Sequence, residues 1–376
     1  MNATRFSAVA VLAVCAACAD ATDSVGPSVT GAYDAVRVGG GIGVVDLGTL
    51  GGKNSHALGL NTPSAGRPLL IVGDAQTTAG QTAATYWYYN VASGVATAGV
   101  ALSTAGDTQS TAYGANESDQ IVGGSYTQVT IGGVTTYPSR AVRWTTSGEV
   151  GTLLGSLGGS YSQASVINTL GEIVGQSTTA DGQMHPFIWS PSATLTDLGF
   201  VAGVDIQVQD RNAAGTIVGS VRFTPSTLQT AFVWRSTGGF ETLPDLGPPP
   251  AGDGIVSYAT AVNDAGVIVG FVNTASFGVR AVRWNLVAGR YVVENLGLGT
   301  GSQANDINNA GEIVGTHRAI RSNGGFYLAG STLKELPGLS GSARPFRINE
   351  NADVVGFSTV RHGYTHAVVW THVRTP

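Results

Sequence analysis

Seven short segments of the chain share one pattern, in which a turn-forming Asn is followed by a run of apolar, β-branched residues. Residues 308–315, with the sequence Asn-Asn-Ala-Gly-Glu-Ile-Val-Gly, give its clearest form. The Asn side chain can bond the backbone two residues on and Gly tolerates a left-handed conformation, so the first half predicts a tight hairpin turn. The continuous apolar run predicts a strand covered on both faces. Copies or looser versions occupy residues 61–73, 116–123, 168–175, 212–219, 263–270 and 349–356.

Two further strands follow each of these units, and a third precedes it. One ends in an aromatic residue, as at 140–144, 185–189, 230–234, 280–284 and 366–370, with Trp87 in the first unit and Phe326-Tyr327 in the sixth. A core role explains the six Trp, because burying one removes ~150–250 Å² of surface. The next strand ends in Leu-Gly. The strand before the Asn usually has an Ala four residues before that Asn, which we call the repeated Ala position. The residues at this position are Ala57, Ala112, Ala164, Val208, Ala259, Ala304 and Pro345.

The closing Gly of the units falls at positions 73, 123, 175, 219, 270, 315 and 356, so the spacing is 41 to 52 residues. Four-stranded units of this length are typical of β-propeller blades. The first predicted strand, at 44–47, is of the Leu-Gly type, and the last one ends at the aromatic Trp370. The N-terminal strand can therefore supply the fourth strand of the last blade, which would leave no open strand edges. We predict an all-β, seven-bladed β-propeller of four-stranded blades, closed by an N-terminal strand that completes the last blade. An open β-solenoid is the alternative.

The repeated elements Leu-Gly-x-Leu-Gly-Gly, Ile-Asn-x-x-Gly-x-Ile-Val-Gly and His-Ala-Phe-x-Trp resemble the HAF family of extracellular repeat proteins. The resemblance runs from about Val44 to the C-terminus. Residues 48–52 and 155–159 match closely, and His366-Ala367-Val368 and His185-Pro186-Phe187 come nearest to the His-Ala-Phe triplet. The resemblance implies secretion and repetition, and it supplies no activity to carry over.

The first residues predict export. Residues 1–21 contain one Arg, a mostly apolar run at 6–18 and small residues, which is typical of a secretory signal and too short to span a bilayer. Two cleavage sites compete: Cys18 as the lipidated residue of a lipoprotein signal, which we favour slightly, or an ordinary site at Ala19-Asp20-Ala21. Residues 22–43 then predict a flexible tether, and 44–376 the propeller domain. We expect an extracellular or cell-envelope protein that meets a membrane only through a lipid anchor.

Composition narrows the partners. The chain has 54 Gly, 11% charged residues and a formal charge of −5, without basic clusters, which argues against nucleic acid. Both Cys lie in the signal, so the domain is expected to have no disulfide. We expect a monomer without cofactor or metal. A calcium loop at Asp306 or Asp210 is disfavoured, because the twelfth position, where a Glu ligand is needed, is His317 or Val221.

No local motif identifies a reaction. The chain lacks a Gly-x-Ser-x-Gly elbow and a His-Glu-x-x-His motif. His362 and His366 are four residues apart, but packing at a repeat position explains His366. Glu172 and Glu312, in the turns, are expected to face solvent, so that Glu312→Ala should be nearly silent.

Two classes of function stay open. Repetition, export and the lack of motifs favour a binding or scaffold module. A secreted hydrolase or lyase that acts on glycans or peptides is the alternative, since propeller enzymes assemble sites from separate blades. It predicts catalytic residues in loops that break the repeat, such as Asp181 and His185.

A candidate binding surface follows from strand alternation, which puts the long, variable loops on the rim opposite the Asn turns. Such loops carry function more often than regular elements. Just before the repeated Ala position, every unit has a residue that can hydrogen-bond, and we call these seven the collar: His56, Thr111, Gln163, Gln207, Tyr258, Gln303 and Arg344. With Tyr161, His317 and Arg318 from adjoining loops, the collar is predicted to contact a polar, glycan-like or anionic ligand at the mouth of the central channel. The alternative is a channel mouth that is simply wet.

Overall fold

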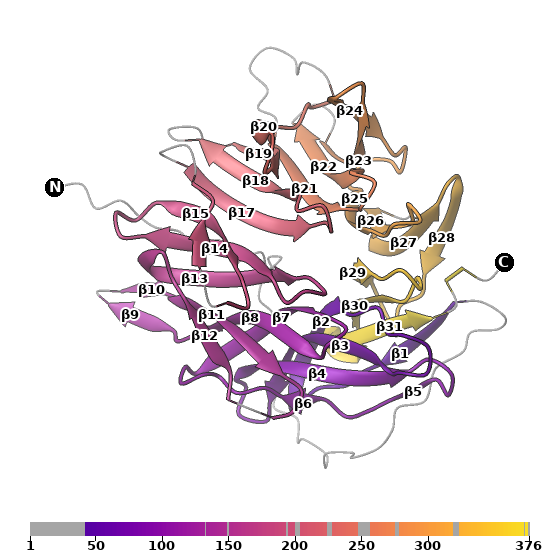
Figure 1. The fold of residues 1–376 in the computed structure, drawn as a ribbon. Coiled ribbons are helices and arrows are strands. Elements are labelled where there is room, and N and C mark those ends of the chain that lie inside the picture. The colour runs from indigo at the N-terminus through magenta and orange to yellow at the C-terminus, as the bar shows by residue number, and fades with distance from the viewer. Residues whose placement is uncertain are drawn as a thin grey trace.

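The chain forms seven antiparallel sheets, the blades, arranged around one axis (Figure 1). The computed structural model describes residues 42–376 except 132, 149, 193–194, 200–203, 224–227, 247–255, 275–277, 319–322, 372 and 375–376. The signal, Cys18 and most of the tether predicted above lie outside the described residues. No helix in the described part is long and apolar enough to cross a membrane.

In each of the first three blades, the strands follow one another in chain order from the innermost strand outward. Blade 1 has β2 (Gly51–Leu60), β3 (Leu69–Thr77), β4 (Thr82–Asn90) and β5 (Val95–Ala96), with β6 (Val100–Ala101) also paired to β4. Blade 2 has β7 (Gln109–Ala115), β8 (Gln120–Tyr126), β11 (Ser139–Thr145) and β12 (Thr152–Gly155), and its long loop forms the hairpin β9 (Val129–Ile131) and β10 (Val134–Thr136). Blade 3 has β13 (Gly158–Ile167), β14 (Ile173–Thr179), β15 (Met184–Trp189) and β16 (Leu195–Asp197).

The other four blades repeat the same order. Blade 4 has β17 (Val204–Arg211), β18 (Ile217–Phe223), β19 (Gln229–Arg235) and β20 (Gly239–Thr242). Blade 5 has β21 (Val256–Val262), β22 (Ile268–Thr274), β23 (Gly278–Val287) and β24 (Arg290–Asn295). Blade 6 has β25 (Gln303–Ile307), β26 (Ile313–Arg318), β27 (Asn323–Ala329) and β28 (Thr332–Leu336). Blade 7 has β29 (Ala343–Ile348), β30 (Val354–Thr359), β31 (Thr365–Thr371) and β1 (Gly43–Asp46), with a 3₁₀ turn, η1 (Arg361–Gly363), before β31.

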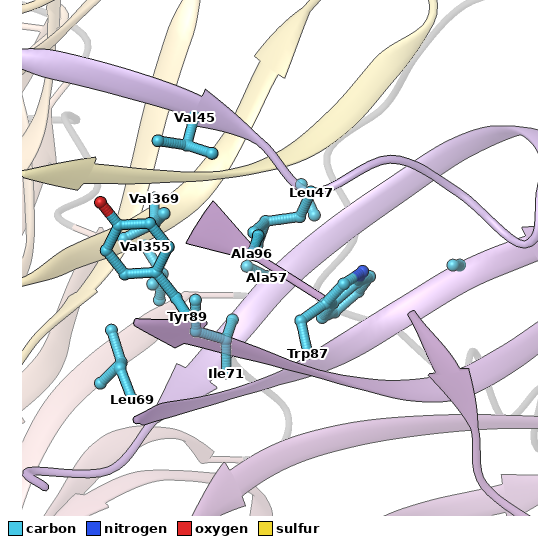
Figure 2. Packing of buried hydrophobic residues seen from close by; sticks show 12 residues of the cluster. Val45, Leu47, Ala57, Leu69, Ile71, Trp87, Tyr89, Ala96, Val355 and Val369 are labelled. Carbon is cyan, nitrogen blue, oxygen red and sulfur yellow. The ribbon is translucent and has the colours of Figure 1, made fainter. Parts of the chain in front are cut away.

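The last blade is completed by the N-terminal strand, which confirms the predicted closure. Strand β1 pairs antiparallel with β31, with Val44 opposite Trp370, and the indigo β1 lies beside the yellow strands of blade 7 (Figure 1). Val45 of β1 and Leu47, which directly follows β1, pack with Val369 of blade 7 and with Trp87 of blade 1 (Figure 2). One apolar cluster therefore joins the two ends of the chain.

The repeated apolar positions form the core between blades, as predicted. Ile313 and Val314 are 1% and 0% exposed, and the equivalent residues of the other units are buried as well. Five Trp are buried, whereas Trp234 is partly buried.

A serine two residues before the repeated Ala position links each of five blades to the blade before it. Its Oγ accepts the N–H of the preceding blade's third strand at 2.9–3.0 Å. The pairs are Ala367 to Ser55, Ala84 to Ser110, Ala141 to Ser162, Ala231 to Ser257 and Ala281 to Ser302. Blades 4 and 7 have Ile206 and Ala343 there, which carry no side-chain oxygen. We call these contacts the serine belt.

The repeated Asn makes a second belt on the opposite rim. Within its own turn, Asn308 Oδ1 accepts the N–H of Glu312 at 3.0 Å. Across the blades, Asn Nδ2 donates to the backbone carbonyl of the next blade's Asn at 2.9–3.2 Å. These links run from Asn116 to Asn168, Asn212 to Asn263, Asn263 to Asn308, Asn308 to Asn349 and Asn349 to Asn61. The last link crosses from blade 7 to blade 1, and we call the set the asparagine belt.

The expectation that Glu312 faces solvent is wrong. Its side chain is 10% exposed, and its carboxylate accepts hydrogen bonds from Asn308, Tyr327 and Arg374 at 2.6–2.7 Å. Burial alone would raise the pKa of Glu312, but these hydrogen bonds outweigh it and hold the pKa below its ordinary value. Because Glu312→Ala would leave Tyr327 and Arg374 without their acceptor, the substitution is not silent. Glu172, more exposed, pairs with Arg211 at 2.9 Å.

A β-bulge lies opposite the closing Gly in every blade. The register between the first two strands shifts just after the repeated Ala position, for example between Ala259 and Ala261. A Cβ added to Gly270 would lie 1.9 Å from the carbonyl oxygen of Tyr258, and the other six closing glycines give 1.9–2.1 Å to the equivalent carbonyl. The bulge therefore requires Gly at this position.

We predict that Gly270→Ala lowers the free energy of unfolding by ~3 kcal/mol or more, since overpacking against rigid backbone costs at least 1–3 kcal/mol. Gly238→Ala is the control, because a Cβ there would come no nearer than 3.4 Å to the Arg235 side chain. Urea unfolding of both variants measures the difference. Equal midpoints would show that the bulge does not constrain this position.

Candidate functional site

The collar residues lie on the innermost strands of the blades. Strands β2, β7, β13, β17, β21, β25 and β29 contact one another in order around the axis, and β29 returns to β2. Each strand carries one collar residue, opposite the residue that follows the closing Gly. Thr111 and Gln207 are buried and the other five are partly exposed. The blades thus bring all seven to one level of the ring.

His56 has partners on both ring nitrogens. Its Nδ1 lies 2.8 Å from Asp74 Oδ1 of the same blade, and its Nε2 lies 3.0 Å from Thr365 Oγ1 of blade 7. Phe357 of blade 7 packs edge-on against the imidazole, with ring centroids 5.0 Å apart. Asp74 is 6% exposed. The histidine is thereby fixed between a buried carboxylate and a hydroxyl group.

Blades 2 and 3 place tyrosines beside the collar. The Tyr161 hydroxyl donates to Gln163 Oε1 at 2.5 Å. Burial raises the pKa of Tyr113, and the neighbouring Tyr161, Asp74 and Tyr126 raise it further. Burial also raises the pKa of Tyr161 and of Tyr126, so these phenols stay protonated at neutral pH and can donate hydrogen bonds. The sequence analysis did not identify Tyr113 or Tyr126 as site residues. Tyr113 could have been found, because it directly follows the repeated Ala position at Ala112, where the bulge lies.

Blades 4 and 5 add unpaired hydrogen-bonding groups and a paired charge. Gln207 Oε1 and Ser220 Oγ, which lie opposite each other, are buried and have no hydrogen-bond partner within the described chain. Arg222 pairs with Asp205 at 2.7 Å. Tyr258 stacks on Phe271 with ring centroids 4.8 Å apart. Orphaned buried polar atoms are rare, but both atoms are shielded from solvent, so a ligand could reach them only after side chains move.

Arg344 in blade 7 is the charged member of the collar. It is partly buried, and no carboxylate of the described residues lies within salt-bridge distance of it. His317, by contrast, lies against the outer strands of blade 6: its Nε2 is 2.7 Å from Glu335 Oε1, and its ring is edge-on to Phe326. Arg318 follows it at the exposed end of β26. Binding by Arg318 or His317 therefore needs a ligand that extends beyond the collar.

Two carboxylates and an arginine lie nearer the Asn turns. Asp210 Oδ2 accepts the N–H of Val262, and Asp306 Oδ2 accepts the N–H of Ile348, each in a neighbouring blade. Arg347 lies 3.8 Å from Asp306 and donates to the carbonyl of Gln209 at 3.3 Å, which joins blade 7 to blade 4. Burial raises the pKa of Asp306 to about 7, against the opposing effect of Arg347, and the Asp210 charge raises it further. The two residues of the disfavoured calcium loops thus bond backbone N–H groups.

The remaining candidate histidines belong to repeat contacts. His366 lies 2.8 Å from Asp46, and His185 lies 2.9 Å from Asp197. In both blades the His at the start of the third strand therefore pairs with the Asp that precedes Leu-Gly in the fourth strand. Across the described residues, no group of three or more His, Cys, Asp or Glu side chains could hold a metal ion. A separate hollow of about 260 Å³ between blades 2 and 3 is lined by residues that include Ser139, Arg140 and Ser162.

The fold and the ring of polar residues define a seven-bladed β-propeller with a collar around its axis. No protein-family model matches the chain, and no curated protein does. Among solved structures, puromycin hydrolase is 15% identical with a TM-score of 0.51, over 86% of this chain and 52% of that chain, so this chain spans about half its length. YCF48 from Cyanidioschyzon merolae is 9% identical with a TM-score of 0.48, over 92% and 100%. A Dyadobacter fermentans protein of unknown function is 12% identical with a TM-score of 0.48, over 87% and 96%. The likeness shows the propeller fold alone.

We predict that Asp306 makes stability fall as pH rises. Its pKa is about 7 in the folded chain and ~4 when unfolded, so the folded state binds the proton more tightly between these values. The contribution of Asp306 to the free energy of unfolding is therefore lost as pH rises from ~4 to ~7.

Urea unfolding of the wild type and of Asp306→Asn from pH 4.5 to 7.5 tests this. The wild-type stability minus that of the variant should decrease by up to ~1.4 kcal/mol per pH unit, the limit for one proton. Asp107→Asn is the flat control, because hydrogen bonds from Ser125 and Arg140 outweigh the effect of burial and lower the pKa of Asp107, so its pH-dependent contribution lies below this range. Parallel stability curves for the wild type and Asp306→Asn would refute the assignment.

Proposed function

We propose that this protein is an exported binding module whose collar binds a polar ligand with an anionic group, and that an acidic glycan is the ligand class that fits best. Arg344 is the observation on which the proposal rests: it is a partly buried cation, and no carboxylate of the described residues pairs with it. Arg222, another arginine beside the collar, is paired with Asp205. Since burying an unpaired charge is costly, a ligand carboxylate is the natural partner for Arg344.

The neutral part of the collar suits a sugar. Gln163 and Gln303 are partly exposed amides that can meet sugar hydroxyls. Tyr258 provides an aromatic ring with a hydroxyl group, a side chain common at binding surfaces. A few placed polar groups among aromatic side chains are what fix a ligand's orientation in known sites.

The proposal includes export. The signal-like residues 1–21, with Cys18 as the lipidation site or a cut near Ala21, support it, as does the resemblance to HAF repeats. At the cell surface a glycan ligand would be accessible. The negative net charge supports a module that does not bind nucleic acid, and we expect it to act as a monomer. The hydrolase alternative receives no support from His185, because its contact with Asp197 repeats that of His366 with Asp46.

An array of neutral and acidic oligosaccharides, followed by calorimetry with the best acidic binder, tests the proposal. The triple variant Gln163→Ala, Gln303→Ala, Arg344→Ala should lose binding while its melting temperature stays that of the wild type. Arg344→Ala alone should weaken binding ~10–100-fold, since hydrogen bonds to charged groups contribute ~1.5–3 kcal/mol.

Arg290→Ala is the matched control, because it removes one exposed Arg from the outermost strand of blade 5. Its affinity should equal that of the wild type. Unchanged affinity in the triple variant, or an equal loss in Arg290→Ala, would place the binding surface elsewhere.

A further inference from the structure

A hydroxyl, an imidazole and a carboxylate form one line at the junction of blades 7 and 1. Thr365 Oγ1 lies 3.0 Å from His56 Nε2, and His56 Nδ1 lies 2.8 Å from Asp74 Oδ1. We propose that Thr365, His56 and Asp74 are a nucleophile, a general base and an orienting carboxylate that together hydrolyse a small carboxylic ester, such as an O-acyl group on a carbohydrate. This inference does not rest on the binding function proposed above.

The geometry assigns each group its role. When Nδ1–H donates to the buried Asp74, the lone pair of Nε2 faces the Thr365 hydroxyl, which is the arrangement that activates a hydroxyl nucleophile. Asn54 Oδ1 accepts the N–H of Thr365 at 3.0 Å, so the threonine is held in place. Asn54 Oδ1 is also a second acceptor for the hydroxyl proton at 3.2 Å, against 3.0 Å for His56 Nε2. Thr365 and His56 are both partly exposed, and a substrate can therefore reach them.

Two members of the triad, His56 and Asp74, differ from the residues at the same positions of the other repeats. The residue after the closing Gly is Asp74 in blade 1 and is Gly124, Gln176, Ser220, Phe271, Thr316 and Phe357 in the others. His56 is likewise the only His in the collar. Six blades form without an imidazole and a carboxylate at these places, so the fold does not require them. A catalytic role explains why they occur together beside a hydroxyl.

The segment before Thr365 is unusual as well. Thr365 is the first residue of β31, directly after the η1 turn and Tyr364. In that turn His362 has φ of 68° and Gly363 has φ of 80°. A non-Gly residue in this region is uncommon, and four other described residues, Ala105, Asp119, Ala288 and Ala352, also adopt it. The turn ends the preceding loop abruptly and places the hydroxyl at the start of the strand.

The reaction balances with water as the only co-reactant. Thr365 Oγ1 attacks the ester carbonyl carbon while its proton passes to His56 Nε2; the bond to the alcohol oxygen then breaks, and that oxygen takes the proton. The acyl group is left on Thr365. Water gives a proton to Nε2 and attacks the acyl carbon, and the proton returns to the threonine oxygen as its bond to the acyl carbon breaks. One ester and one water yield one acid and one alcohol.

Hydrolysis of p-nitrophenyl acetate by the full chain, with peptide mass spectrometry of the reacted protein, tests the inference. Thr365→Val keeps the β-branched shape and should lower kcat/KM ~10²–10⁴-fold, as should His56→Gln, because positioned general bases contribute this much. Asp74→Asn should lower kcat more than it raises KM. Thr365→Ser should stay active, and an acetyl group should be found on the peptide that contains residue 365.

His366→Gln is the matched control, since His366 Nδ1 pairs with Asp46 and no hydroxyl of the described residues bonds its other nitrogen. It should hydrolyse the ester at the wild-type rate, and all variants should share the wild-type unfolding midpoint. An acetyl group absent from residue 365, or a Thr365→Val rate equal to that of the wild type, would overturn the inference. Neither outcome bears on glycan binding by Arg344.

Discussion

The ring depends on satisfying backbone N–H groups that the contact between blades removes from water. Leaving one such group unpaired costs ~1–3 kcal/mol, and apolar side chains cannot offset it. The serine belt meets this need near the collar, and the asparagine belt ties the turns on the other rim. Where blade 4 has Ile206 in place of Ser, the facing residue of blade 3 is Pro186, which has no N–H to satisfy. A different bond joins these two blades, because Gln176 Oε1 accepts the N–H of Val208 at 2.8 Å. Each blade is thus hydrogen-bonded to its neighbour as well as packed on it.

These belts fix the innermost strands, and through them the collar. The bulge after the repeated Ala position brings the closing Gly against the carbonyl of the collar residue, so the backbone at this level is the same in all seven blades. Side chains can then vary without loss of the ring. That freedom explains how residues as different as Arg344, Tyr258 and His56 stand at equivalent positions of the collar. A second set of equivalent positions, two residues after the repeated Ala position, holds Asp210, Asp306 and Arg347 in blades 4, 6 and 7.

The sequence could predict the architecture because the repeat is local: an Asn turn, an apolar run and a Trp each lie within one blade. The closure of the ring was also predictable, because the first and last strands of the chain are complementary parts of one blade. The side-chain contacts between blades could not be predicted. Glu312 meets Arg374, which is 62 residues away, and His56 meets Thr365, which is 309 residues away. The serine of the serine belt recurs in the sequence two residues before the repeated Ala position, but the N–H group that it bonds belongs to the preceding blade. Whether a turn carboxylate is exposed or paired is decided by residues that no local pattern contains.

A crystal structure of the chain with the acidic oligosaccharide that it binds best is the most direct test of the collar as a ligand site. The account predicts a ligand carboxylate within ~4 Å of the Arg344 guanidinium, the range of an ion pair, and sugar hydroxyls on Gln163 and Gln303. A ligand seated instead in the hollow lined by Ser139, Arg140 and Ser162, or on the Asn turns, would contradict it.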